Sequence, residues 1–529
     1  MRLALAQINA TVGDFDGNLA RIRGAARRAS GADLVLFPEL AISGYMPRDL
    51  LEEPSFLDRC AASLAALAAS RDLPPLLVGC PLRAEGVGKP LLNVAALVRE
   101  GRIEAVAKRL LPTYDVFDEK RYFRPGGAPE PVEIAGERLG VTICEDIWTG
   151  PLYAGDPVAD LVRLGVRAVV NLSASPYCKG KPARRREIAA AHARRHGVPI
   201  ALCNLVGAND QLIFDGNSFV VGARGDLCGH AAPFREDLLL VDLEGAAGAV
   251  APEESLREAI LLGIRDYFGK TGFSKALLGM SGGIDSSLVA CLAVEALGPG
   301  NVTGIGMPGP FSAGMSLEDA ETLARRLGIR FLTMPILDAY DSALASLRAA
   351  WGDRPFDVAE ENLQARLRGL FLMSLANKEG ALVLAPSNKS EMAMGYCTLY
   401  GDMVGALAPI ADLYKTEVYA LAREYPQIPE RSVTRPPTAE LAPGQVDQDS
   451  LPPYETLDSI LRLSMEERLR PAEIVDAGFD RATVERVLRT VARTEYKRQQ
   501  ASPVLRLTEK AFGLGRRFPI VERFEGGAR

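Results

Sequence analysis

Short runs of apolar residues recur along the first half of the chain, and they constrain its fold more than any other feature. Such runs predict buried β-strands. They lie at residues 3–8, 34–37, 76–78, 94–98, 141–144, 168–172, 200–202, 219–221 and 238–241. Longer amphipathic stretches separate some of the runs, whereas turn signals at 99–102 and 223–226 join others as hairpins. This mixture predicts a layered α/β domain with mixed sheets rather than a plain β-α-β succession.

A segment of small residues divides the chain. Residues 244–252 are rich in Gly, Ala and Pro and lack periodicity, which is typical of a linker. We therefore predict domains at 1–245 and 256–529, joined by a linker at 246–255. Ser255, at the end of the linker, is the predicted N-cap of the first helix of the second domain. Four further apolar runs then alternate with helical patterns, at 276–280, 302–307, 331–334 and 381–385. The alternation predicts a Rossmann-like doubly wound parallel sheet, followed by a Pro-rich loop at 428–454 and a helical tail at 456–498.

The composition disfavours several classes of protein. Lys plus Arg number 61 and Asp plus Glu 67, so the formal net charge is −6, which argues against a dedicated nucleic-acid binder on electrostatic grounds. Three His residues leave little room for His-rich metal chemistry or a Ser–His–Asp triad. The eight Cys lack the spacing of a disulfide framework, and no apolar run is long enough to cross a bilayer. We expect a soluble cytoplasmic protein without nucleic-acid or membrane partners.

Three side chains in the first half suit the hydrolysis of an amide. Cys144 is a strong nucleophile, and Glu39 can accept its proton. Lys108 can stabilise a developing oxyanion, and its charge should also favour the thiolate. Each residue taken singly has an ordinary explanation, because a cysteine in an apolar strand usually packs in the core and a lysine is usually solvated.

The motifs around these residues resemble the nitrilase (carbon–nitrogen hydrolase) superfamily. They are the segments 37–40, 108–123 and 143–148, which agree with the family in order and spacing. The resemblance covers residues 1–245 and implies an α-β-β-α sandwich that acts as a glutamine amidase. The site residues that it implies are catalytic Glu39, Lys108, Cys144 and Glu119, and glutamine-binding Tyr114, Ser173 and Ser175.

A Gly-rich turn at 279–283, between an apolar run and a helical pattern, predicts a phosphate-binding loop. Gly282 and Gly283 allow close approach of the backbone, and N–H groups at the helix start form an anion site with the Ser hydroxyls. No Gly-Lys-Ser/Thr follows, so this is not a Walker A loop. The segment 281–286 instead resembles the pyrophosphatase loop, in which Asp285 is suited to Mg²⁺.

Further motifs extend that resemblance to the NAD⁺ synthetases over about residues 256–520. They lie at 362–368, 386–391, 400–402, 413–419, 436–441, 495–498 and 510–519. The implied ATP-binding residues are Gly279, Ser281, Gly282, Asp285, Ser286, Ser287, Lys415 and Thr438. The implied deamido-NAD⁺ contacts are Asn362, Arg366, Asp402 and Lys510, and the implied Mg²⁺ ligands are Asp285 and Glu391. The apolar segment 308–311 departs from the polar sequence expected near the adenine.

A nitrilase-like domain joined to such a synthetase domain is the arrangement of the glutamine-dependent NAD⁺ synthetases. The resemblance implies that Cys144 releases ammonia from L-glutamine. It further implies that ATP converts deamido-NAD⁺ to an acyl-adenylate, which ammonia turns into NAD⁺. We expect an internal path for the ammonia and a homo-oligomer. Two alternatives remain open: another ATP-pyrophosphatase amidotransferase, and a non-catalytic scaffold with decayed sites.

Two of the three histidines, His192 and His196, stand four residues apart. With Cys178 and Cys203 they could indicate a metal site. The segment 192–196 lacks the Glu of a zinc-protease helix, however, so we interpret it as an ordinary helix face.

Overall fold

The computed structural model describes residues 1–243, 245, 247–352 and 354–522. The chain divides into two compact units, Met1–Ala259 and Ile260–Arg529. The division falls within α5 (Leu256–Thr271), where the backbone amide of Glu258 donates to Ser255 Oγ as expected for an N-cap. Residues 244 and 246 of the predicted linker segment, and 523–529 at the predicted domain end, lie outside the described residues.

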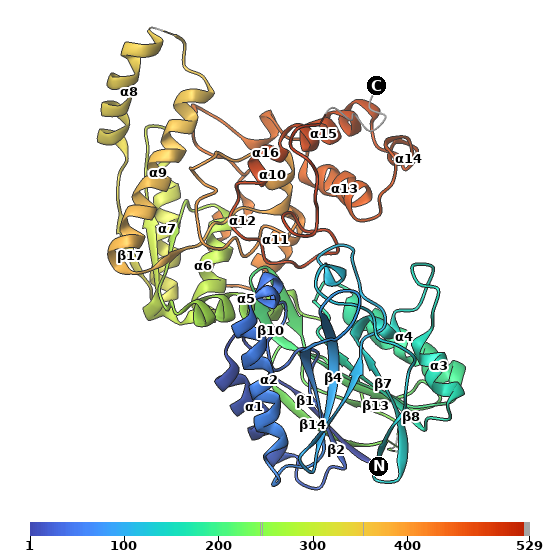
Figure 1. The fold of residues 1–529 in the computed structure, drawn as a ribbon. Coiled ribbons are helices and arrows are strands. Elements are labelled where there is room, and N and C mark those ends of the chain that lie inside the picture. Colours follow the sequence, from blue (N-terminus) through green and yellow to red (C-terminus); the bar gives the residue numbers. More distant parts are fainter. Residues whose placement is uncertain (244, 246, 353, 523–529) are drawn as a thin grey trace. The chain divides into compact units, whose positions relative to one another are not determined.

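The first unit is an α-β-β-α sandwich, with two six-stranded sheets between outer helices (Figure 1). The first sheet has the order β14-β1-β2-β3-β4-β5. Its strands are β1 (Arg2–Gln7), β2 (Leu34–Leu36), β3 (Leu76–Arg83), β4 (Leu91–Arg99), β5 (Arg102–Ala107) and β14 (Asp237–Asp242). The second sheet has the order β13-β12-β9-β8-β7-β6. Its strands are β6 (Val132–Ile134), β7 (Glu137–Ile143), β8 (Ala168–Ser173), β9 (Ile200–Asn204), β12 (Phe219–Val221) and β13 (Leu227–His230).

Helices cover the outer face of each sheet. Helices α1 (Phe15–Arg28) and α2 (Pro54–Ala68) pack on the first sheet, and α3 (Pro157–Arg163) and α4 (Lys181–His196) pack on the second. The remaining elements are the hairpin β10 (Val206–Asn209) and β11 (Leu212–Asp215), and the 3₁₀ turns η1 (Arg48–Glu52), η2 (Glu119–Arg121) and η3 (Cys144–Ile147). Buried Leu5, Leu36, Val141 and Leu172 belong to one core cluster, in which side chains from both sheets meet. The predicted fold class and every predicted strand of this unit are confirmed.

Five strands of the first unit have no predicted counterpart, namely β5, β6, β10, β11 and β13. Strand β5 shows why, because it lies at the edge of its sheet and most of its side chains are exposed. An edge strand that faces solvent needs no apolar run, so its sequence carries only a weak signal.

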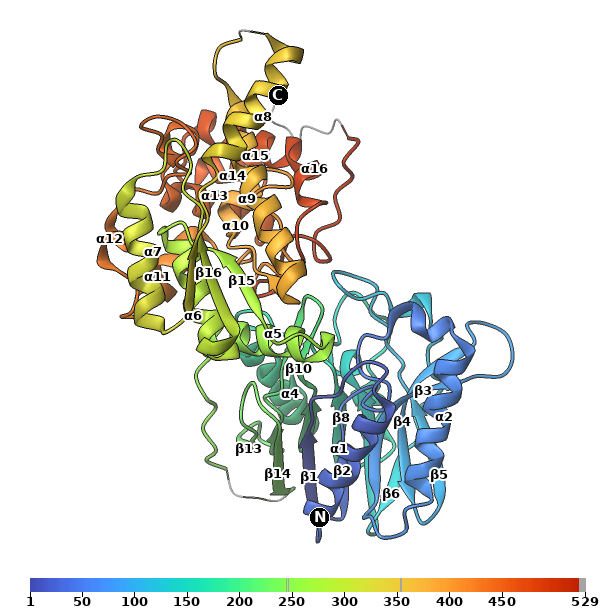
Figure 2. The same cartoon turned by 90° about the vertical axis from the view of Figure 1, so that its left-hand side faces the viewer.

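The second unit contains a parallel four-stranded sheet with the order β17-β16-β15-β18. Its strands are β15 (Ala276–Gly279), β16 (Val302–Gly306), β17 (Arg330–Thr333) and β18 (Leu382–Val383). Helices α6 (Ile284–Leu297) and α7 (Gly314–Leu327) lie on one face, and α9 (Val358–Glu379) packs against β15 and β18 (Figure 2). Strand order reverses between β15 and β18. Groups beyond the carboxyl ends of these two strands therefore converge at the point where ligands bind in such sheets.

Helices make up the rest of the second unit. They are α8 (Leu337–Trp351), α10 (Lys389–Met394), α11 (Lys415–Ala422), α12 (Glu430–Thr434), α13 (Tyr454–Met465), α14 (Pro471–Asp476), α15 (Arg481–Arg493) and α16 (Glu495–Arg498), with 3₁₀ turns η4 (Pro299–Asn301) and η5 (Asp447–Asp449). The predicted helical tail is four helices rather than one, because Pro471 begins a new helix and Gly478, at φ 102°, breaks the next junction. The predicted loop at 428–454 holds α12 and η5. None of the described helices combines the length and apolar character needed to cross a bilayer.

Candidate active sites

Cys144 stands at a sharp turn between a strand and a short helix. It is the first residue of η3, directly after β7, and its φ of 44° lies in the left-handed region. Asp146 holds this turn: its Oδ2 accepts from the Ile143 amide at 2.9 Å, and its Oδ1 accepts from the amides of Arg109 and Leu110 at 3.0 and 2.8 Å. One carboxylate thus links the turn that contains Cys144 to the segment that follows Lys108.

Lys108 lies buried between two carboxylates. Its Nζ donates to Glu39 Oε1 and to Glu119 Oε1, each at 2.7 Å. Glu39 is held further by Asn93 Nδ2, which donates to Oε1 at 2.8 Å, and by the Ala174 amide, which donates to Oε2 at 3.1 Å. The ordinary interpretation of Lys108 as a solvated surface charge is therefore wrong. The geometry leaves the ammonium fixed in place, as oxyanion stabilisation requires.

Burial determines the protonation of this site. It raises the pKa of the Cys144 thiol well above its ordinary value, Glu39 raises it further, and Lys108 opposes the rise only in part. Lys108 therefore favours the thiolate, as expected, but burial and the nearby carboxylates outweigh its effect on the pKa of the thiol. Burial acts to lower the pKa of Lys108, but the carboxylates of Glu119 and Glu39 outweigh it, and the ammonium form is kept. Nucleophilic attack by this thiol would require a base to take its proton, and Glu39 is the carboxylate that raises the pKa of the Cys144 thiol most strongly.

The predicted glutamine contacts differ in accessibility. Tyr114 is 41% exposed, and its hydroxyl donates to Glu145 Oε1 at 2.8 Å. Ser173 is fully buried and its hydroxyl donates to Asn171 Oδ1 at 2.6 Å, while the Ser175 amide donates to Asn204 Oδ1 at 2.9 Å. The two serines are therefore engaged within the wall of the unit. Glu145, which follows the nucleophile directly, is a polar group of the site that the sequence motifs did not single out.

A cavity of about 430 Å³ opens beyond the carboxyl ends of β15, β16 and β18. Nine predicted residues line it: Gly279, Ser281, Asp285, Ser286, Asn362, Glu391, Asp402, Lys415 and Thr438. Four others do not line it: Gly282, Ser287, Arg366 and Lys510. Its volume falls in the range of small-molecule sites.

The conformation of the phosphate loop explains why Gly282 and Ser287 do not line the cavity. Gly282 has φ 76°, and a Cβ there would lie 2.2 Å from the Ser316 carbonyl oxygen, so the residue supports the loop from behind. The Ser287 hydroxyl donates to the Gly283 carbonyl at 2.8 Å, within the first turn of α6. The hydroxyls of Ser281 and Ser286 lie 3.2 Å apart at the cavity. Backbone amides and these two hydroxyls therefore form the anion-binding surface.

Two carboxylates of the cavity converge on one cation. Lys415 Nζ donates to Asp285 Oδ2 at 2.5 Å and to Glu391 Oε1 at 3.0 Å, while Asn388 Nδ2 donates to Asp285 Oδ1 at 2.9 Å. Burial raises the pKa of Glu391 to about 8, against the opposing effect of Lys415 and with a further rise from Asp285. Two oxygen donors that share one positive charge suit a hard cation, so this pair of residues fits Mg²⁺.

The structure places Arg368 at the cavity, whereas the predicted Arg366 lines a different hollow. Arg368 lines the cavity and its Nε donates to the Met307 carbonyl at 3.0 Å. Arg366 lines a second hollow with Leu370 and Tyr400. Residues two apart on a helix lie on nearly opposite faces, so only one of the two can reach the cavity. Asp447 and Tyr396 also line the cavity, although no sequence motif pointed to them, and so does Lys497 of the motif at 495–498.

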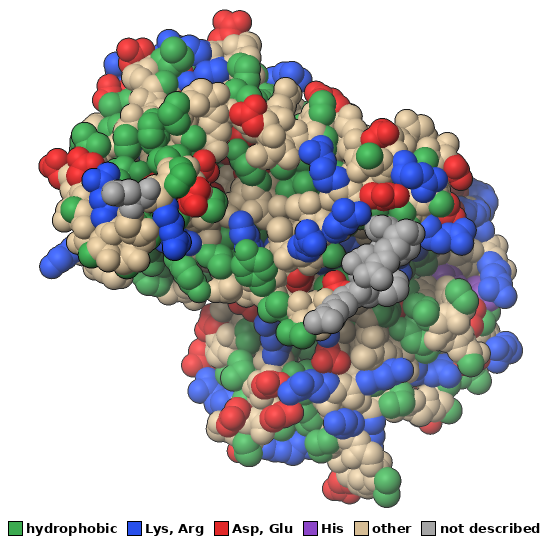
Figure 3. Space-filling view, turned by 90° about the horizontal axis from the view of Figure 1, so that it is seen from above, with side chains coloured by type: hydrophobic (Ala, Val, Ile, Leu, Met, Phe, Trp, Pro, Cys, Tyr) green, Lys and Arg blue, Asp and Glu red, His purple; other side chains and the backbone are tan. Residues whose placement is uncertain are grey.

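Basic and acidic side chains are interspersed over the face drawn in Figure 3. Attraction of an anionic substrate by this face therefore depends on local groups rather than on a field of one sign.

Comparisons with known proteins follow the division of the chain. A family model described as carbon-nitrogen hydrolase matches residues 2–251, and one described as NAD synthase matches residues 256–501. A glutamine-dependent NAD(+) synthetase of Synechocystis sp. is 47% identical, and one of Thermotoga maritima is 43% identical; each alignment covers 99% of both chains. Among solved structures, the glutamine-dependent NAD+ synthetase of Acinetobacter baumannii in complex with ADP is 40% identical, with a TM-score of 0.78 over 98% of both chains.

Proposed function

The chain belongs to the family of glutamine-dependent NAD⁺ synthetases, and from this premise we propose roles for its residues. It catalyses the ATP-dependent amidation of deamido-NAD⁺ to NAD⁺ with L-glutamine as the amide donor, giving AMP, pyrophosphate and glutamate. The full-length relatives favour this activity over another ATP-pyrophosphatase amidotransferase or a decayed scaffold. We assign the glutaminase to residues 1–245, the linker to 246–255 and the synthetase to 256–529.

The observation that carries this function is the buried constellation of Cys144, Lys108 and Glu39. In the proposed reaction Cys144 Sγ attacks the amide carbon of glutamine while Glu39 accepts the thiol proton. Lys108, positioned by Glu39 and Glu119, stabilises the oxyanion. Glu39 then protonates the leaving nitrogen, ammonia departs, and a water activated by Glu39 hydrolyses the thioester to glutamate.

Substrate binding in the glutaminase divides between accessible and buried groups. We assign direct contact with glutamine to Tyr114, because it is exposed and its hydroxyl orders the carboxylate of Glu145. Ser173 and Ser175 support the wall of the pocket through their buried hydrogen bonds.

In the synthetase cavity, the nicotinate carboxylate of deamido-NAD⁺ attacks the α-phosphorus of ATP, and pyrophosphate leaves. Ser281, Ser286 and the amides of the loop hold the phosphates, and Lys415 and Thr438, which line the same cavity, also contact the nucleotide. Ammonia then attacks the acyl-adenylate carbonyl, and AMP leaves with the electron pair of the broken C–O bond.

Two further groups of residues complete the proposed cavity. Asp285 and Glu391 would hold Mg²⁺, which supplies charge neutralisation for the phosphates. Asn362, Asp402 and Arg368 line the cavity and are assigned to deamido-NAD⁺. The assignments of Arg366 and Lys510 to this substrate remain predictions, as does the internal path for ammonia.

We also propose a homo-oligomer and a cytoplasmic location. Leu370 and Tyr400 are 58% and 65% exposed around the second hollow, and apolar side chains grouped in this way support an interface between copies of the chain. The eight cysteines are free thiols, which is typical of a reducing compartment. Light scattering after gel filtration measures the molecular mass in solution. A mass equal to that of one chain would contradict the homo-oligomer.

The test of the function is NAD⁺ formation from deamido-NAD⁺ and ATP, with glutamine or an ammonium salt as donor. We expect Cys144→Ala to reduce the glutamine-driven reaction to background and to keep the ammonium-driven reaction. Cys203→Ala is the matched control, since Cys203 is buried in the same core cluster and has no proposed role. If Cys144→Ala loses both reactions while Cys203→Ala keeps them, the proposal of two separate sites is wrong.

A further inference from the structure

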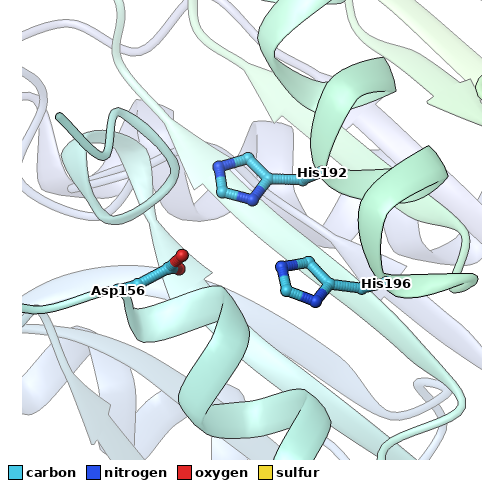
Figure 4. A group of neighbouring side chains, drawn as sticks. All are labelled: Asp156, His192 and His196. Atoms are coloured by element: carbon cyan, nitrogen blue, oxygen red, sulfur yellow. The ribbon is translucent and has the colours of Figure 1, made fainter.

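Three side chains of the first unit converge outside both proposed active sites. His192 and His196 lie four residues apart on α4, and Asp156 immediately precedes α3 (Figure 4). One ligand atom from each residue lies within 4.8 Å of the other two. Two imidazoles and a carboxylate in this arrangement are a common donor set for a transition metal.

The unsatisfied atoms of the two histidines are the ones that face each other. Within the described residues, His192 Nδ1 and His196 Nε2 are buried without a hydrogen-bond partner. Figure 4 shows both atoms directed toward the space beside the Asp156 carboxylate. Buried polar atoms without hydrogen-bond partners are unfavourable. Two such nitrogens directed at one point are suited to bind a metal ion.

A hydrogen bond behind His192 selects the tautomer that metal binding needs. His192 Nε2 lies 3.0 Å from the Ile147 carbonyl oxygen. A carbonyl can only accept, so Nε2 carries the proton and the neutral ring keeps a lone pair on Nδ1. A backbone carbonyl behind a ligating histidine is the usual supporting contact in metal sites.

The carboxylate also has an oxygen to offer. Asp156 Oδ1 caps α3 by accepting from the Ala159 amide at 3.0 Å. Oδ2 has a solvent-facing neighbour, Arg195, whose Nη1 lies 3.6 Å away. That long, exposed ion pair is weak, so a divalent cation can displace it.

We propose that Asp156, His192 and His196 form a binding site for Zn²⁺, with water as the fourth ligand. Imidazole nitrogen suits zinc and disfavours Mg²⁺ and Ca²⁺, so the site is chemically distinct from the carboxylate pair of the synthetase cavity. The sequence alone does not place Asp156 beside the two histidines, because Asp156 precedes a different helix.

The bound ion joins α4 to the start of α3. Through His192 Nε2 it also supports the Ile147 carbonyl, at the end of the turn that Cys144 begins. The site is therefore structural: the ion stabilises the first unit without touching glutamine. Zinc should raise the thermal midpoint of the glutaminase and leave ammonium-driven synthesis unchanged.

The experiment uses the full chain without a polyhistidine tag, stripped of metal by a chelator and then titrated with Zn²⁺. Calorimetry should give one zinc per chain. Replacement by Co²⁺ should give visible absorption without the intense near-ultraviolet band of a thiolate ligand, which excludes binding at a cysteine. Differential scanning fluorimetry with and without Zn²⁺ measures the stabilisation.

Two variants and a control make the assignment specific. Asp156→Asn keeps an acceptor for the helix cap but removes the charge, and His196→Ala removes one imidazole. Each should weaken Zn²⁺ binding by about tenfold or more and abolish the zinc-induced thermal shift. His230→Gln changes the remaining histidine and should leave both unchanged. Failure of the wild type to bind one equivalent, or wild-type affinity in Asp156→Asn and His196→Ala, would overturn the proposal.

Discussion

Substitution of one loop glycine should disable the synthetase site while the glutaminase keeps working. In Gly282→Ala the new Cβ would lie 2.2 Å from the Ser316 carbonyl oxygen, whereas ordinary contact begins at 3.4 Å. The phosphate loop must therefore move by about 1.2 Å, and a displacement of about 1 Å in a catalytic site can lower a rate by about 10²-fold. The φ of 76° adds strain of about 1–2 kcal/mol for an alanine.

Substitution of Gly298, at the other end of α6, is a control that separates the effect of backbone strain from the effect of a steric clash. Gly298 caps α6 at φ 85°, and no atom lies within 4 Å of the position that a Cβ would take there, so Gly298→Ala carries the strain alone. The assay is ammonium-driven NAD⁺ formation at varied ATP, with glutamate release from glutamine as internal reference. Gly282→Ala should lose about 10²-fold in the first activity and little in the second. If its ammonium-driven rate stays within about threefold of Gly298→Ala, the argument from backbone collision is wrong.

Three further predictions concern carboxylates. Asp146→Asn should destabilise the first unit by about 1–3 kcal/mol in urea denaturation, because an amide cannot accept from all three backbone donors; Asp160→Asn, at a partly exposed ion pair, should change stability by less than about 1 kcal/mol. Burial raises the pKa of Glu119 from 4.5 to about 7 despite the opposing charge of Lys108, so its contribution to stability is full below pH 4.5 and is lost as the pH rises to about 7. The thermal midpoint of the wild type should therefore fall relative to Glu119→Gln across that window, and a rise would refute the assignment. Glu391→Gln should raise the Mg²⁺ concentration for half-maximal ammonium-driven activity by about tenfold or more, with glutamine hydrolysis unchanged; an unaltered Mg²⁺ dependence would exclude Glu391 as a ligand.

Apolar runs located the strands that are buried on both faces. Such a strand must be apolar throughout, so 168–172 is visible in the sequence as β8. Strand β5 was not predictable in this way, since it lies at an edge with most of its residues exposed. Strands β10 and β11 were missed because each is only four residues long, although β11 is fully buried. The prediction of a single helical tail was wrong for another reason. The apolar periodicity continues across Pro471 and Gly478, although the helical backbone is interrupted at both residues.

Some site residues could be predicted from a local motif, whereas the positions of others depend on tertiary packing. Cys144 and the phosphate loop lie in contiguous motifs, so their chemistry could be predicted. The phase of α9, which turns Arg368 toward the cavity and Arg366 away from it, depends on packing. The zinc site that we propose was invisible because Asp156 and His192 are brought together only by the contact between α3 and α4.

The burial of Cys144 also protects it from unwanted chemistry. Oxidation and alkylation proceed through the thiolate, and this thiol keeps its proton in the resting site. Small oxidants and electrophiles should therefore react first at the more accessible Cys228 and Cys397. Cys144, which we propose as the nucleophile, should therefore react with a substrate-shaped reagent that enters its pocket before it reacts with a small oxidant.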